Sequence, residues 1–68
     1  MSSVKQIRVE LLDALHQLSR LRPQWRLGQL IANLAGWANQ EVWEVEDEQL
    51  LAVAREHLDQ QSNRAASA

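Results

Sequence analysis

The sequence contains no cysteine, phenylalanine or tyrosine, and it has only one proline and two glycines. Without cysteine the chain can form neither a disulfide nor a thiolate metal site. Two isolated glycines cannot build the glycine-rich loop that cradles phosphate groups. No apolar run approaches the roughly 18 residues of a membrane-spanning helix, and the first residues lack the pattern of a signal peptide. We therefore expect a cytoplasmic protein that does not contact the membrane.

Residues typical of catalysis are equally sparse. His16 and His57 lie far apart in the sequence, without the H-E-x-x-H spacing of a zinc site. All serines except Ser19 lie in the terminal segments, and no G-x-S-x-G motif is present. The acidic run EVWEVEDE lacks the residue order of a calcium loop. The sequence thus predicts a protein that is not an enzyme and that holds no metal and no cofactor.

Charges of opposite sign are separated along the chain. Residues 1–40 contain five basic and two acidic residues, a net charge of +3, whereas residues 41–60 contain one basic and seven acidic residues, a net charge of −6. The whole chain has a formal charge of −2. Such a distribution favours ion pairing within the chain or between subunits.

The spacing of apolar residues predicts a helix over 4–21. Apolar residues three and four positions apart form one stripe: Val4, Ile7, Leu11, Ala14, Leu18 and Leu21. Leu15 lies beside this stripe and widens it. Val9 and Leu12 fall outside this stripe. Because proline disfavours the α conformation of the residue before it, Arg22–Pro23 ends this helix.

A second helix is predicted over 23–36, with Pro23 at its first position and Gly36 as its stop. It has one face of larger residues (Leu27, Leu30, Ile31, Leu34) and one of small residues (Gly28, Ala32, Ala35). An apolar arc wider than half the circumference indicates burial on more than one side. We expect this helix to be the centre of the structure and the surface of association.

A third helix is predicted over 46–60, where acidic residues suit its N-terminus. Its buried stripe is Leu50, Leu51, Ala54 and Leu58. Residues 61–68 show no apolar periodicity and are predicted to be a disordered tail. The fold prediction is therefore all-α: a single three-helix domain over residues 1–60, associating through its central helix.

Tryptophan and arginine, which are enriched in the centres of interfaces, supply the candidate binding residues. Trp25, between Arg22 and Arg26, best fits an interface anchor, and core packing is an equally good interpretation. For Trp37 and Trp43 packing is favoured, with Trp43 the next candidate anchor. The predicted partner-binding residues are Arg22, Trp25, Arg26, Gln29 and Trp43.

Two segments resemble a group of short bacterial proteins without an established function. RPQWRLGQL is similar to an R-P-x-W-R-x-G-Q-L segment of that group, and WEVEDEQLL to a later W-x-x-E-D-E-x-L-L. The similarity covers residues 22–58. The resemblance implies a bacterial origin and signature positions at Pro23, Trp25, Arg26, Gly28, Gln29 and Leu30, and it assigns no catalytic residue.

These observations favour a non-enzymatic interaction or regulatory module that binds itself, as a homodimer, or one protein partner. A chain of 68 residues without disulfide or metal often needs another surface for stability. The alternative is a nucleic-acid-associated regulator that uses Arg20, Arg22 and Arg26 with Trp25. The acidic start of the last helix argues against nucleic acid, because phosphate would repel it. A minor enzyme subunit is a third hypothesis.

Overall fold

The chain folds into three helices, α1 (Val4–Leu21), α2 (Leu27–Trp37) and α3 (Asp47–Ser67). In this computed structural model the backbone of residues 3–67 and the side chains of residues 3–60 are described. The described part contains no strand. The predicted all-α three-helix fold is confirmed.

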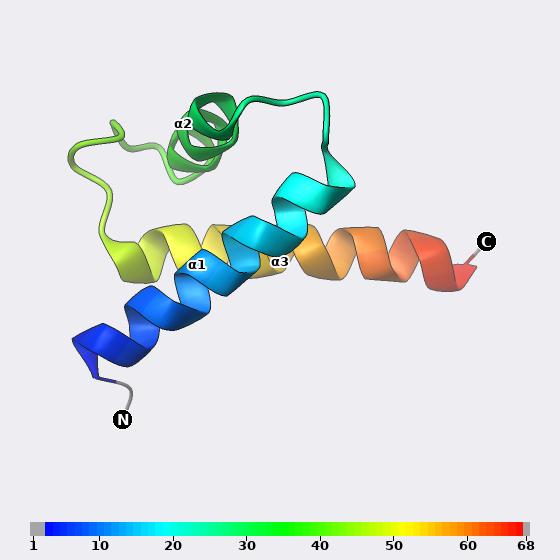
Figure 1. Cartoon of the computed structure of the whole chain (residues 1–68), viewed down its shortest axis with the longest axis horizontal. Coiled ribbons are helices and arrows are strands. Elements are labelled where there is room, and N and C mark those ends of the chain that lie inside the picture. Colours follow the sequence, from blue (N-terminus) through cyan, green and yellow to red (C-terminus); the bar gives the residue numbers. More distant parts are fainter. Residues whose placement is uncertain (1–2, 68) are drawn as a thin grey trace.

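The core lies where α1 and α3 cross, and α2 covers one side of this pair (Figure 1). All three helices contribute to it; the buried cluster is Leu11, Ala14, Leu15, Leu18, Leu30, Leu34, Leu50, Leu51 and Ala54. The prediction that the second helix is the centre is wrong, because α1 and α3 make the most extensive contact. Only Leu30, Leu34 and Ala35 of α2 are buried, so its outer face is open to solvent.

Helix α1 has the predicted bounds and buries the predicted stripe at its middle. Its N-terminus is capped by Ser3, whose hydroxyl accepts a hydrogen bond from the Gln6 N–H (3.1 Å). The two ends of the stripe differ from the expectation, since Val4 and Leu21 are exposed.

Helix α2 begins four residues later than predicted. Pro23 is not its first residue but the second residue of a turn, closed by the Trp25 N–H donating to the Arg22 carbonyl (3.0 Å). Proline favours this position because its fixed φ suits the turn. The extended Arg26 (φ −72°, ψ 153°) then caps the helix, and Leu27 is its first residue.

Helix α2 ends at Trp37, one residue beyond the predicted stop at Gly36. The left-handed residue that ends it is Asn39 (φ 59°), and no glycine has a positive φ among the described residues. The Asn39 N–H donates to the Gly36 carbonyl and the Gln40 N–H to the Ala35 carbonyl, both at 3.0 Å. These two bonds form a Schellman motif, in which asparagine replaces the usual glycine.

Helix α3 begins at Asp47, within the predicted range, and buries Leu50, Leu51 and Ala54 of the predicted stripe, whereas Leu58 is only partly buried. It continues to Ser67, so the backbone of residues 61–67 is helical where the sequence predicted an end at residue 60 and a disordered tail. This segment contains alanine, glutamine and arginine and has no glycine or proline to stop a helix. The last residue of the predicted tail, at position 68, lies outside the described residues.

Across the described residues, no helix combines the length and the apolar character that crossing a bilayer requires.

Candidate functional site

Two of the predicted binding residues, Arg22 and Trp25, lie in the connection after α1 and belong to a stack of side chains that reaches α2 and α3. The Arg22 guanidinium lies over the Trp25 ring, 5.6 Å from its centroid. The Trp25 ring is 6.4 Å from that of Trp37, which stacks on His57 at 3.7 Å. Trp25 also packs against the core. The stack therefore fixes the connection after α1 to the end of α2 and to α3.

The stack leaves little room for a ligand. The hollow beside it holds only about 20 Å³, which is close to the space needed for one water molecule. Trp37, predicted to be a core side chain, is half exposed and contributes one face to His57 instead. The half-exposed state of Trp37 is consistent with this stacking, because His57 covers only one face of the indole ring.

Gln29, a third predicted binding residue, caps the N-terminus of α2. Its side-chain oxygen accepts a hydrogen bond from the Arg26 N–H at the start of α2 (2.9 Å). Gln49 does the same for the Glu46 N–H at the start of α3 (3.0 Å). Each bond satisfies a backbone donor that a helix N-terminus leaves free. The two sequence segments that carry the resemblance thus lie at the starts of α2 and α3.

Trp43, another predicted binding residue, lies in a tight turn between α2 and α3. Its side chain is 80% exposed, so the packing interpretation favoured for it is wrong. The turn is closed at Glu41, whose carbonyl accepts hydrogen bonds from the Glu44 N–H (2.9 Å) and the Val45 N–H (3.0 Å). Val42 and Trp43 occupy the central positions, where glycine, proline, asparagine and aspartate are usual.

An apolar groove lies between α1 and α2, with a volume of about 330 Å³. Its lining combines exposed and partly buried residues of both helices with the buried Leu15 at its base: Leu12, Leu15, His16, Ser19, Leu27 and Ile31. Leu12 and Leu27 are exposed, and Gly28 beside them has nothing within 4 Å of the position that a Cβ would take. The apolar pattern of the sequence does not predict this groove, although Leu12, an apolar residue outside the α1 stripe, is a signal of it.

Charge is distributed unevenly over these surfaces. Arg26 directly precedes Leu27 of the groove, and Arg20 lies one helical turn beyond His16. Within the described part, neither arginine forms an ion pair, and neither do Glu41 and Glu44 of the turn. The ion pairs that do form join α1 to α3 elsewhere, between Arg8 and Asp47 (2.6 Å) and between Arg55 and Glu10 (3.6 Å).

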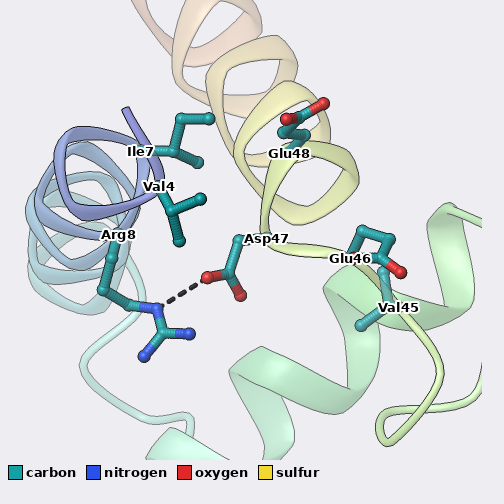
Figure 2. A pocket seen from close by; sticks show the side chains of 7 residues that line it. All are labelled: Val4, Ile7, Arg8, Val45, Glu46, Asp47 and Glu48. Carbon is teal, nitrogen blue, oxygen red and sulfur yellow. Dashed lines mark hydrogen bonds and ion pairs between the residues drawn. The ribbon is translucent and has the colours of Figure 1, made fainter. Parts of the chain in front are cut away.

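A second hollow, of about 440 Å³, opens between the N-terminal ends of α1 and α3 (Figure 2). Figure 2 shows the Arg8–Asp47 ion pair bridging its two walls. The remaining lining residues come from both helices and the segment before α3: Val4, Ile7, Val45, Glu46 and Glu48. Because its charged centre is already paired internally, this hollow is the weaker candidate.

The described residues contain no group of three or more histidine, cysteine, aspartate or glutamate side chains placed to hold a metal ion. No protein-family model matches the chain, and no curated protein or solved structure matches it significantly. The candidate function therefore depends on the two surfaces described above, the α1–α2 groove and the Glu41–Val45 turn.

Proposed function

We propose that this protein is a non-enzymatic protein–protein interaction module that self-associates through the α1–α2 groove. The observation that carries the proposal is the groove itself, in which Leu12 and Leu27 are exposed on two neighbouring helices around an apolar hollow. Contiguous exposed apolar surface of this kind marks interaction sites in soluble domains.

The energetics favour covering this groove. Fully burying a leucine side chain contributes roughly 1.5–3 kcal/mol, so Leu12 and Leu27 together supply a substantial part of a binding free energy. The small residues of α2 next to them, Gly28 and Ala32, are exposed and allow a second chain to come close. A domain of this size has a small core, and association adds to its stability by mass action.

Nucleic acid fits these surfaces less well. One face of the Trp25 ring is covered by Arg22 and the ring packs on the core, which leaves little of it for base stacking. The groove is lined mainly by leucine and isoleucine, whereas phosphate is bound by charged and polar donors. Arg20 and Arg26 supply positive charge near the groove, but no tryptophan, phenylalanine or tyrosine lines it for bases to stack on.

The test compares two variants with the same chemical change. Leu27→Asp places a charge in the groove, and Val4→Asp places one at another exposed residue outside it. Leu27 and Val4 are each the first residue of their helix and are 60% and 78% exposed. Aspartate is favourable in the first turn of a helix, so both variants should fold. In sedimentation velocity we expect Leu27→Asp to weaken self-association by about tenfold or more, and Val4→Asp to match the wild type.

Other results would contradict the proposal. A wild-type chain that stays monomeric at all concentrations excludes self-association, and equal effects of the two variants exclude the groove. Binding of duplex or single-stranded oligonucleotide that weakens steeply with salt would support the nucleic-acid alternative instead.

A further inference from the structure

The Glu41–Val45 turn has the form of a ligand for an apolar pocket with a basic rim. Its two central side chains, Val42 and Trp43, are 46% and 80% exposed, and Glu41 and Glu44 flank them. Two hydrogen bonds to the Glu41 carbonyl close the turn. A turn held in this way loses little conformational freedom when it binds, and tryptophan is a frequent anchor of interfaces.

The α1–α2 groove has the complementary properties. Its lining is apolar, and Arg26 and Arg20 lie at the end where α1 connects to α2. These arginines and the glutamates of the turn all lack ion-pair partners within the described part of the chain. We propose, building on the self-association proposed above, that the occupant of the groove is the Glu41–Val45 turn of a second copy of this chain.

The charge distribution decides between two modes of association. A symmetric dimer built groove to groove leaves the arginines without a partner of opposite charge, and one built turn to turn places the glutamates together, so neither pairs the unpaired charges of the two surfaces. Contact between the groove of one copy and the turn of another brings opposite charges together. This arrangement is head-to-tail.

The positions of the two surfaces support the same mode. In Figure 1 the connection after α1 and the longer connection that contains the turn leave α2 toward opposite sides. The groove residue Leu27 follows the first of these connections and the turn lies in the second, so the two surfaces are formed by different segments of each copy. A contact between unlike surfaces leaves a free groove and a free turn at the two ends, so it continues into a chain or closes into a ring.

The experiment uses two full-length variants that each lose one surface. Trp43→Ala keeps the groove, and Leu27→Asp keeps the turn. In sedimentation velocity we expect the wild type to form species larger than dimers, each variant alone to lose about tenfold or more in self-association, and their equimolar mixture to form a 1:1 heterodimer. Trp43→Phe, which keeps an aromatic ring at the turn, is expected to associate nearly as the wild type does.

Nuclear magnetic resonance locates the contact. Unlabelled Leu27→Asp is added to ¹⁵N-labelled Trp43→Ala, and we expect amide shifts in the α1 residues around Leu12 and His16 and in the first turns of α2. Shifts confined to other residues would overturn the inference.

The outcomes also separate this inference from the proposed function. If Leu27→Asp abolishes self-association and Trp43→Ala does not, the groove is a symmetric interface and only the head-to-tail inference fails. If the wild type is monomeric, both fail. If neither variant associates alone and the mixture forms no heterodimer, the turn is not the occupant of the groove.

Discussion

The three tryptophans of this chain occupy three different environments. Trp25 packs on the core and carries Arg22 on its ring, Trp37 stacks on His57 at the end of α2, and Trp43 projects into solvent from a turn. A buried aromatic side chain contributes mainly to folding, whereas an exposed one contributes to folding very little. The same residue type therefore serves stability at one position and, in our proposal, binding at another.

This difference gives a test at the scale of single residues. We expect Trp25→Ala to lower the free energy of unfolding by about 2 kcal/mol, because it removes packing from the core. Trp43→Ala should change it by no more than about 0.5 kcal/mol. Urea denaturation at low protein concentration, where association does not contribute, measures both. A large loss of stability in Trp43→Ala would mean that its side chain packs within the folded chain.

At the scale of elements, the ends of the helices are set by side chains that the apolar pattern does not reveal. The oxygens of Gln29 and Gln49 fix the starts of α2 and α3, and Asn39 in the left-handed conformation ends α2. Gly36, although close by, keeps a negative φ and remains inside the helix. The end of α2 in turn sets the direction of the connection that carries Trp43.

Asn39 provides a prediction at this scale. A left-handed conformation costs most L-residues roughly 1–2 kcal/mol, and asparagine and glycine tolerate it better. We expect Asn39→Ala to reduce the free energy of unfolding by about 1 kcal/mol, and Asn39→Gly to leave it unchanged or to raise it slightly. Thermal unfolding followed by circular dichroism distinguishes the two. Equal stability of both variants would argue against the Schellman geometry.

At the scale of the whole molecule, the charge that is separated along the sequence is only partly paired in the described part of the fold. Part of it is used internally, by the ion pairs that join α1 to α3. Arg20 and Arg26 beside α2, and Glu41 and Glu44 of the turn, are among the charged residues that have no ion-pair partner within the described part of the chain. Opposite charges at different surfaces favour association between unlike faces.

Association also affects stability, because only folded chains carry the groove and the turn. We expect the melting temperature of the wild type to rise with protein concentration, by about 5 °C for a tenfold increase once association is appreciable. Leu27→Asp should melt at a temperature independent of concentration. Differential scanning calorimetry over a range of concentrations measures this. A constant melting temperature in the wild type would argue against self-association of the folded chain.

The amino-acid pattern alone is enough to predict the all-α class, the bounds of α1 and the start of α3, although not the end of α3. Regular spacing of apolar residues is a local property, so it specifies a helix and its buried stripe without knowledge of the partner. This holds for Leu11, Leu18, Leu50 and Ala54, all of which were expected to be buried and are. The start of α2 was placed too early because Pro23 suits both the first turn of a helix and a preceding turn.

Only the tertiary structure decided which apolar residues stay uncovered. Leu27 and Leu30 look alike in the sequence. Because α2 packs on one side of the α1–α3 pair, Leu30 is buried against that pair, whereas Leu27 stays exposed. Trp25 and Trp43 were both candidate anchors, and the packing of the helices covers part of the first and leaves the second in solvent. Exposure depends on what lies opposite a side chain, and that partner is distant in the sequence. For this reason the groove, the turn and their complementary charges were visible only after the helices were placed together.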